Sequence, residues 1–448
     1  MIKSDIFCLT NENGDLLPPA VQATILAKYS RSPLSAREII SQLSEEEADK
    51  FQEKWVGQYG HNSVAELANV PVCFENVSII ASKIIESWQR AGYSEKSTRY
   101  QEFSRDSFIT PPGAPSSMKE FAANFYDAYE KLLPKMIKVC AEKMGEDPNA
   151  AEVKRTVKAR AFDNVRYLLP AGTGTNLAAV LNMRDLRDMI VTLKSHENSE
   201  FNEIGAGLEE AGKSLCPALI RHTDPHKFNL KVKKAGLSLS EKLSGDSVEL
   251  LEDFRTIRGN GIIEQETFEF QSRVKSMYGL SWEEFSNFMD TRPSYSEVPE
   301  IFKMIPITFN INMDYGAFRD LQRHRRCEQF VEPLTTSYGF SIPDDILGSQ
   351  HEQEYVDAML KISEYNDEKV VNDVDLFQYM IPLGYRHMST FQMDLRELYY
   401  VVELRTKPQG HISYRRIAYQ MYELAKERYP DLMKWCRAIN PTEIGAHT

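Results

Sequence analysis

A cluster of basic side chains interrupts an acidic chain at Gln322–Pro333, which reads QRHRRCEQFVEP. Guanidinium groups bind phosphate oxygens through paired, charge-assisted hydrogen bonds, so Arg323, His324 and Arg325 are candidate contacts for an anionic ligand. Local pairing is the alternative, because on a helix the carboxylate of Asp320 is within reach of Arg323 or His324. The cluster therefore predicts either an anion site or a solvated, internally paired face.

A second polar stretch, GYSEKSTRYQ from Gly92, carries a carboxylate, a hydroxyl and a guanidinium at alternate positions. In an extended chain Glu95, Ser97 and Arg99 lie on one side, because successive side chains point to opposite faces. Such a row can hold a nucleotide, with the glutamate on sugar hydroxyls and the serine and arginine on the phosphate. An exposed polar strand with a Glu–Arg ion pair is the alternative.

Two predicted helix starts offer further anion contacts. In GHNSVAEL, from Gly60, Ser63 and Glu66 have the spacing of a capping box. Asn182 and Asp185 have cap-like positions before the helix predicted through MRDLRDMIVTL. A helix N-terminus presents free N–H groups to an anion such as a pyrophosphate, so each place predicts either a ligand contact or only a cap.

Three other patterns do not predict sites. GLEEAGKS, residues 207–214, matches the P-loop pattern GxxxxGK[ST], but the surrounding apolar spacing predicts an amphipathic helix. The proline in HTDPH, residues 222–226, spoils a helical pair of histidine ligands, so no metal site is expected. The six cysteines lie far apart, which is typical of free thiols in a reducing compartment.

The elements that position these residues must form more than one domain, because 448 residues exceed one typical core. The net charge of −12 argues against general nucleic-acid binding, so an anion site must be local. The sequence has no run of 18 apolar residues and no signal-peptide pattern at its start, and a cytoplasmic protein is therefore expected.

Internal similarity divides the chain into two related parts. RYLLPAG at 166–172 matches QYMIPLG at 378–384, and each is followed at the same distance by a second match, NMRDLRDM from Asn182 and DLRELYYV from Asp394. Arg184 and Arg396 then correspond. We predict an N-terminal repeat at 1–225, a linker at 226–264 and a C-terminal repeat at 265–448.

Apolar spacing predicts long helices over 115–144 and 414–430 and strands over 70–80 and 304–313. The predicted class is α+β, with two helix-rich copies of one fold, each with a small antiparallel sheet and long helices.

An Arg-His-Arg followed by E-x-S-x-R-Y, with GHxSxxE upstream and R-x-x-L-P and N-x-R downstream, is the signature of the flavin-dependent thymidylate synthases. The chain resembles this family twice. The resemblance implies FAD as cofactor and the methylation of dUMP to dTMP, with methylenetetrahydrofolate as carbon donor and NADPH as reductant. Family members are usually homotetramers that build each active site from several subunits.

Neither copy keeps every motif of the family. At the Arg-His-Arg position the first copy has Ser87, Trp88 and Gln89, and at the serine and arginine positions the second copy has Pro333 and Thr335. By resemblance, Ser97 and Arg405 are the expected catalytic residues. The expected substrate-binding residues are Glu95, Ser97, Arg99, Tyr100, Arg166 and Arg405. The expected FAD-binding residues are His61, Ser63, Glu66, Asn182, Arg184, Arg323, His324, Arg325 and Arg396.

Because the losses are complementary, we expect the two repeats to share sites and a homodimer of the double-length chain to imitate the family tetramer. The expected partners are small molecules, namely dUMP, folate and NADPH, with no nucleic acid and no membrane. The alternative is a family member that binds flavin or nucleotide without making dTMP, or that alkylates another pyrimidine nucleotide.

Overall fold

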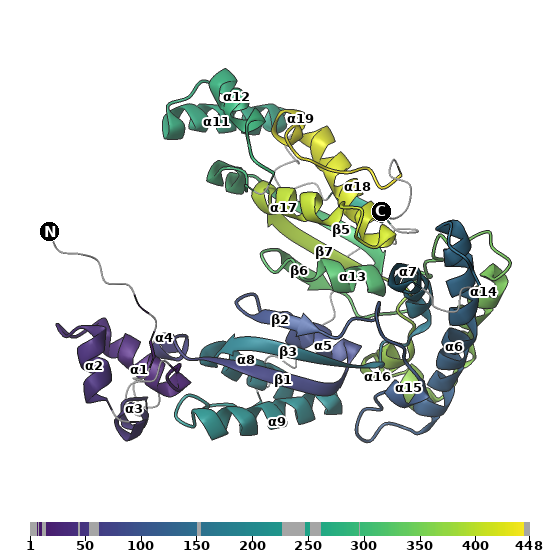
Figure 1. Ribbon diagram of the computed structural model, residues 1–448, viewed down its shortest axis with the longest axis horizontal. Coiled ribbons are helices and arrows are strands. Elements are labelled where there is room, and N and C mark those ends of the chain that lie inside the picture. Colours follow the sequence, from purple (N-terminus) through teal and green to yellow (C-terminus); the bar gives the residue numbers. More distant parts are fainter. Residues whose placement is uncertain are drawn as a thin grey trace. The chain divides into compact units, whose positions relative to one another are not determined.

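The computed structural model describes residues 7, 9–10, 15–43, 45–52, 62–149, 154–225, 247–250, 261–294 and 296–442 (Figure 1). The chain forms two compact units. The first consists of Met1–Lys96, Ile109–Ala114 and Gly174–Gly236, and the second of Ser97–Phe108, Pro115–Thr173 and Leu237–Thr448. Part of the predicted N-terminal repeat therefore lies in the same unit as the predicted C-terminal repeat.

The first unit starts with three short helices, α1 (Pro19–Tyr29), α2 (Ala36–Gln42) and α3 (Glu45–Gln52). A capping box begins α2, in which the Ser35 hydroxyl and the Glu38 carboxylate satisfy each other's backbone N–H groups. Apolar side chains from all three helices form a small core of Val21, Ile25, Ile39 and Ala48.

The sheet of the first unit contains β1 (Asn69–Ser78), β2 (Gly92–Glu95) and β3 (Gly174–Asn182), all antiparallel in the order β1-β3-β2. Its helices are α4 (Asn62–Ala65), α5 (Ile79–Ile85), α8 (Met183–Lys194) and α9 (Ser199–Leu215). The P-loop-like segment lies inside α9, which confirms the helical prediction.

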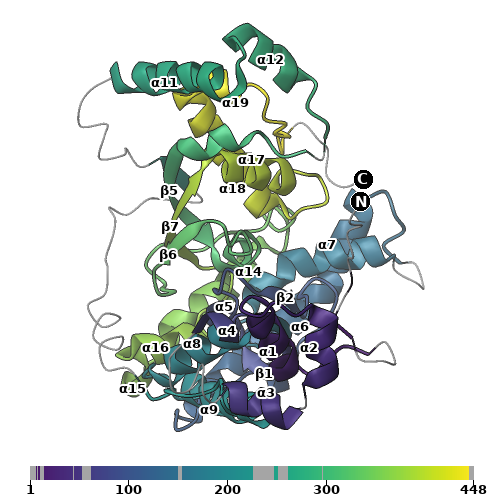
Figure 2. The ribbon, with the colours of Figure 1, turned by 90° about the vertical axis from the view of Figure 1, so that its left-hand side faces the viewer.

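The sheet of the second unit has four antiparallel strands in the order β4-β5-β7-β6. They are β4 (Ser247–Leu250), β5 (Pro306–Asp314), β6 (Glu328–Val331) and β7 (Arg386–Asp394). The helices α13 (Tyr315–Leu321), α17 (Leu395–Arg405) and α18 (Ile412–Arg428) pack on this sheet and on one another (Figures 1 and 2).

Helices make up the rest of the second unit. They are α6 (Ser117–Lys143), α7 (Arg155–Val165), α11 (Gly261–Tyr278), α12 (Trp282–Asp290), α14 (Glu352–Leu360), α15 (Glu368–Val371), α16 (Val374–Phe377) and α19 (Pro430–Met433). Short 3-10 helices lie at η2 (Arg105–Ser107), η3 (Arg166–Leu168), η5 (Glu300–Met304), η6 (Lys361–Glu364) and η7 (Gln378–Met380). Both long helices and both strands named from the sequence are confirmed, with boundaries moved by a few residues.

The two matching sequence segments, RYLLPAG and QYMIPLG, pair with each other in the second unit. The backbone N–H of Gly384 donates to the carbonyl of Tyr167 at 2.9 Å, and Gly172 donates reciprocally to Tyr379 at 2.8 Å. Pro170 and Pro382 face each other at the centre of this antiparallel bridge. Equivalent residues thus exchange equivalent hydrogen bonds, which is the pattern of a local two-fold axis within one chain.

Equivalent positions also begin equivalent helices in the two copies. Ser78 caps α5 and Asp314 caps α13, each directly after the first long strand of its copy. Asn182 caps α8 and Asp394 caps α17, each directly after the last strand. The shared strand–cap–helix pattern supports two diverged copies of one fold.

Two local predictions are wrong. Ser63 lies inside α4, which starts at Asn62, so it does not cap that helix. The extended reading of GYSEKSTRYQ holds only to Glu95, because the backbone N–H of Arg99 donates to the Ser97 hydroxyl at 3.2 Å and turns the chain there.

No helix in the described ranges has the length and apolar character needed to cross a membrane. The five described cysteines, at 73, 140, 216, 327 and 436, are free thiols.

Candidate functional site

Two arginines and an aspartate form the centre of a buried polar cluster in the second unit. Arg99 donates from Nε and Nη2 to the same oxygen of Asp163, at 3.0 and 2.7 Å. The Nε atom of Arg166 lies 3.7 Å from the other oxygen of Asp163. The side chain of Arg99 is 25% exposed, whereas those of Asp163 and Arg166 are 8% and 5% exposed.

Local structure explains this grouping. Asp163 lies in the last turn of α7 and Arg166 begins η3, so a spacing of three residues places the two side chains on one side. Arg99 reaches them from the turn that the Ser97 hydroxyl stabilises. The cluster therefore joins two motifs that the sequence separates by more than 60 residues.

Arg166 has more hydrogen-bonding capacity than the described residues use. Its Nε and Nη2 atoms are buried and make no hydrogen bond within the described ranges. Burial disfavours the charged guanidinium, but the surrounding negative groups, of which Asp163 has the largest effect, together outweigh burial and raise the pKa of Arg166. A buried, permanently charged group with unused donors is suited to an anionic ligand.

Side chains of the second copy complete the cluster. The Nδ1 atom of His411, the N-cap of α18, accepts from the backbone N–H of Ser413 at 3.3 Å and lies 3.4 Å from the Tyr167 hydroxyl. Burial lowers the pKa of His411 to about 4, so the imidazole is neutral at pH 7. Nη1 of Arg319 donates to the Thr98 hydroxyl at 3.4 Å, which connects α13 to the turn that carries Arg99.

Arg405, at the end of α17, extends the cluster along the second copy. Its Nε donates to Nε2 of His324 at 2.8 Å, and its guanidinium carbon lies 5.5 Å from the ring centre of Tyr414. Since Nε2 of His324 accepts this bond, its proton is on Nδ1, which lies 3.5 Å from Glu397. Burial lowers the pKa of His324, which favours this neutral form.

The remaining predicted substrate residues lie elsewhere or face solvent. Glu95 belongs to the first unit, where its carboxylate accepts from Ser82 and Lys83, both at 2.9 Å, and its side chain is 2% exposed. Tyr100 is exposed, with the Arg155 guanidinium 5.0 Å from its ring centre. Of the six predicted substrate residues, the structure brings together Arg99 and Arg166 directly, with Ser97 in the same turn.

The predicted flavin residues of the first unit form an ion-pair group. Glu66 pairs with both Arg184 and Arg90, and Arg90 also pairs with Asp185 at 2.6 Å. Asn182 is used as the cap of α8, where it accepts from the backbone N–H of Asp185 at 2.9 Å.

The other two predicted flavin residues of the first copy are Ser63 and His61. Ser63 is exposed, and His61 lies outside the described residues.

The predicted flavin residues of the second unit differ in their burial and in their hydrogen-bond and ion-pair partners. His324 is buried against Arg405, and Arg396 is paired with Glu297 and Glu300. Arg323 is exposed and has no ion pair or side-chain hydrogen bond with the described residues, while Arg325 is half-buried. The alternative of local pairing between Asp320 and Arg323 or His324 is not seen in the described part of the chain.

Sequence reasoning missed three members of the cluster, Asp163, His411 and Tyr414. Asp163 could have been found, because a carboxylate three residues before a predicted ligand arginine is in reach of it on a helix. His411 and Tyr414 gave no signal, since their relation to Arg99 and Arg166 depends on the packing of α18 in the second unit.

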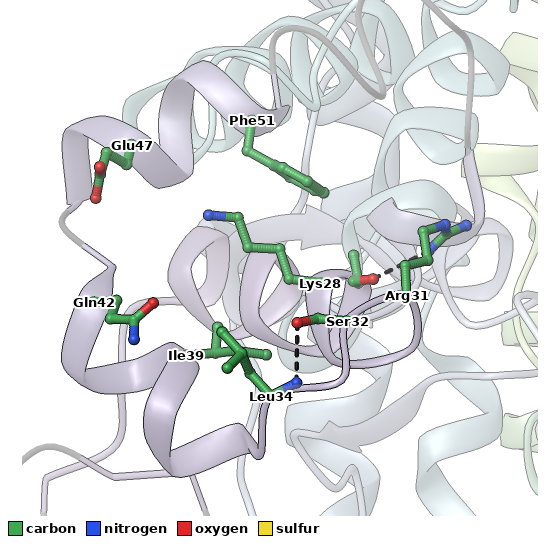
Figure 3. Close-up of a pocket in the computed structure, with 9 residues that line it drawn as sticks. Lys28, Arg31, Ser32, Leu34, Ile39, Gln42, Glu47 and Phe51 are labelled. Atoms are coloured by element: carbon green, nitrogen blue, oxygen red, sulfur yellow. Dashed lines mark hydrogen bonds between the residues drawn. The ribbon is translucent and has the colours of Figure 1, made fainter.

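The first unit also contains a pocket of about 410 Å³ among α1, α2 and α3 (Figure 3). The Nζ of Lys28 lies 5.7 Å from the ring centre of Phe51, and Leu34 and Ile39 supply apolar walls. None of the residues predicted as site residues lines this pocket.

Comparison with known proteins identifies relatives over both copies. The family model described as "Thymidylate synthase complementing protein" matches residues 19–218 and 269–431. A UPF0159 protein of Chlamydia pneumoniae is 28% identical, over 93% of this chain and 88% of that protein. The family match over two separate segments is consistent with the predicted tandem.

Single-copy relatives match about half of the chain. A flavin-dependent thymidylate synthase of Clostridium tetani is 24% identical, over 47% of this chain and 85% of that enzyme. A crystal structure of flavin-dependent thymidylate synthase from Helicobacter pylori, complexed with FAD and dUMP, has a TM-score of 0.30 and 15% identity, and covers 44% of this chain and 89% of that one.

Proposed function

Because the chain belongs to the thymidylate synthase complementing protein family, we propose that it is a flavin-dependent thymidylate synthase whose nucleotide site is the cluster around Arg166. The reaction is the reductive methylation of dUMP to dTMP, with methylenetetrahydrofolate as carbon donor and NADPH as reductant. The observation that carries the proposal is the buried guanidinium of Arg166, with two nitrogen atoms that make no hydrogen bond in the described part of the chain.

Each part of the cluster has a role toward the nucleotide. Arg166 and Arg99 donate to the phosphate, with the hydroxyl of Ser97 beside them. Asp163 holds both arginines near one point before the ligand arrives, so less rearrangement is needed on binding. Phosphate binding partly replaces Asp163 as the partner of these arginines.

Arg405 acts on the pyrimidine. Its Nε is fixed by His324, and His324 is fixed by Glu397, so the direction of the guanidinium is set by a chain of buried contacts. A positioned cation at a ring carbonyl favours the polarised form of the pyrimidine, in which negative charge lies on that oxygen, and so makes carbon 5 a better nucleophile.

The donor chemistry of the second unit fits FAD in part. Arg323 presents an exposed guanidinium without an ion pair among the described residues, and such a group suits a pyrophosphate. Arg396 would have to exchange its carboxylate partners for the cofactor. When bound, reduced FAD supplies the hydride that converts the transferred methylene to a methyl group.

The test begins with the visible absorbance of the purified protein, which should show bound flavin. After the flavin is reduced, addition of dUMP with methylenetetrahydrofolate should reoxidise it and yield dTMP. Bound flavin that is never reoxidised under these conditions would instead support a family member that binds ligands without making dTMP. Protein that takes up neither flavin nor dUMP would refute the proposal.

A further inference from the structure

Asp320, near the end of α13, is a carboxylate without a direct partner. It is half-buried, and it makes no hydrogen bond and no ion pair within 4 Å in the described ranges. Its two neighbours in the basic cluster do not supply one, because His324 contacts Arg405 and Glu397, and Arg323 is exposed. Keeping a carboxylate half-buried and unpaired costs free energy, so a ligand that donates to it is the natural complement.

The position of Asp320 points it toward the cluster. Gly316 lies four residues earlier and therefore on the same face of α13. This face is close to Tyr167, since an ideal Cβ at Gly316 would lie 2.5 Å from a ring carbon of that tyrosine. The helix also packs on α18, which carries His411 and Tyr414 at its start.

The electrostatics of the neighbouring groups agree with this placement. Burial raises the pKa of Tyr414, and the negative charge of Asp320 raises it further. The same charge adds to the effect of Asp163 in raising the pKa of Arg166. Asp320 therefore acts on both the phosphate-binding end and the Tyr414 end of the cluster.

Arg405, whose guanidinium carbon lies 5.5 Å from the ring centre of Tyr414, has part of its guanidinium unused. Its Nε is taken by His324, but its two terminal nitrogens have no hydrogen-bond partner among the residues that the structure describes. The charges of Asp320 and Arg405 both act on the pKa of Tyr414, which Asp320 raises and Arg405 lowers. A ring bound beside Tyr414 thus meets a two-pronged donor from Arg405 and an acceptor from Asp320.

This pair of groups matches cytosine better than uracil. Cytosine presents an amino donor at position 4 next to two adjacent acceptors, N3 and O2, whereas uracil presents a single N–H between two carbonyls. A guanidinium fork fits two adjacent acceptors, and a carboxylate accepts from the cytosine amino group. With uracil bound, the carboxylate of Asp320 would face the O4 carbonyl, which cannot donate to it. The guanidinium of Arg405 would then bind only one acceptor, because the N3–H of uracil separates its two carbonyl groups.

We propose that Asp320 is a specificity-determining residue that makes this site accept a cytosine nucleotide, dCMP, at least as well as dUMP. The inference rests on the proposed function, because it takes the cluster as the nucleotide site. The phosphate contacts of Arg99 and Arg166 are the same for both nucleotides, so the difference between them lies at the ring.

The experiment compares the binding of dCMP and dUMP to the full-length protein as isolated, by isothermal titration calorimetry, in the wild type and in Asp320→Asn. Asparagine keeps the shape but can donate to the O4 of uracil. In the variant, the dissociation constant of dCMP divided by that of dUMP should rise by roughly 10- to 100-fold relative to the wild type, as expected for one base-edge contact. Asp431→Asn, at an exposed position of α19, is the matched control and should leave the ratio unchanged.

The outcomes separate the two proposals. If the wild type binds dUMP more tightly than dCMP, or if Asp320→Asn leaves the ratio unchanged, this inference is overturned while the proposed function stands. If the wild type binds neither nucleotide, the nucleotide site itself is wrong and both proposals fail. If Asp320→Asn proves unfolded by circular dichroism, Asp320→Glu replaces it and should also shift the ratio, because the longer carboxylate misplaces the acceptor.

Discussion

Replacing Arg166 with methionine should weaken nucleotide binding strongly while leaving the stability of the free protein almost unchanged. Two buried nitrogens of Arg166 are unsatisfied, and each such group costs about 1–3 kcal/mol. Its ion pair with Asp163 at 3.7 Å offsets this cost, and Asp163 keeps Arg99 as a partner when Arg166 is removed. We therefore expect the free energy of unfolding to change by less than about 1 kcal/mol.

The loss in binding should be much larger. Two charge-assisted hydrogen bonds to the phosphate, at about 1.5–3 kcal/mol each, correspond to a weakening of dUMP binding of roughly 10²- to 10⁴-fold. Urea unfolding and calorimetric titration with dUMP measure the two quantities on the same preparation.

Arg160 provides the matched control, because it is a carboxylate-paired arginine in α7, the helix that directly precedes Arg166. It donates from Nε and Nη2 to the two oxygens of Asp345, at 2.7 and 2.8 Å. Arg160→Met leaves that carboxylate with weaker partners and should cost about 3 kcal/mol of stability. If Arg166→Met is as destabilising as Arg160→Met and dUMP affinity is unchanged, Arg166 is a structural residue and the reasoning fails.

Two other predictions concern stability. Burial lowers the pKa of His411 to about 4 and that of His387 to about 3, against 6.5 for an unshifted histidine. The unfolded chain therefore takes up protons before the folded one, so stability present above pH 6.5 should be lost as the pH falls from about 6.5 to 4 for His411, and to 3 for His387. A urea midpoint that stays constant between pH 7.5 and 4.5 would contradict this. Gly172→Ala should cost about 1–3 kcal/mol, because its Cβ would lie 2.9 Å from a carbonyl oxygen across the bridge between the two copies. Thermal unfolding measures this against Gly92→Ala, where the space is open, and equal effects of the two changes would count against close packing at the bridge.

Features fixed by neighbours in the sequence were predictable. The cap at Asn182 and the long helix over 115–144 depend on residues within a few positions, and both are confirmed. The extended reading through Arg99 failed for a local reason, because the Ser97 hydroxyl competes for a backbone N–H and forms a turn. That competition was visible in the residue types, but its outcome was not.

Features fixed by packing were not predictable. Glu95 reads as a ligand in its motif, yet its carboxylate is held by Ser82 and Lys83 on a preceding helix. Asp163 and Arg99 are far apart in the sequence and meet only because the turn at 97–100 folds into the second unit. Motif reasoning thus found the arginines of the cluster but not the acid that holds them.

The second copy shows how one chain can lose part of a motif without losing the fold. Gln378 stands where the first copy has Arg166, and its amide oxygen accepts from the backbone N–H of Leu334 at 3.0 Å. Thr335 stands where the first copy has Arg99, and its hydroxyl accepts from the backbone N–H of Ser337 at 2.9 Å. Side chains that could bind phosphate are replaced by side chains that hold their own loop.

The contribution of Arg99 by one copy and Arg405 by the other predicts the activity of mixtures of two inactive variants. Arg99, from the first copy, and Arg405, from the second, lie in one compact unit of a single chain. A site built within one chain cannot be repaired by a partner, so inactive Arg99→Ala and Arg405→Ala chains should stay inactive after they are unfolded together and refolded. If sites instead drew these residues from different chains, half of the dimers would be hybrids with one intact site each, and about a quarter of wild-type activity would return. Recovery of dTMP formation toward that level would therefore show that the two halves of the site come from different subunits.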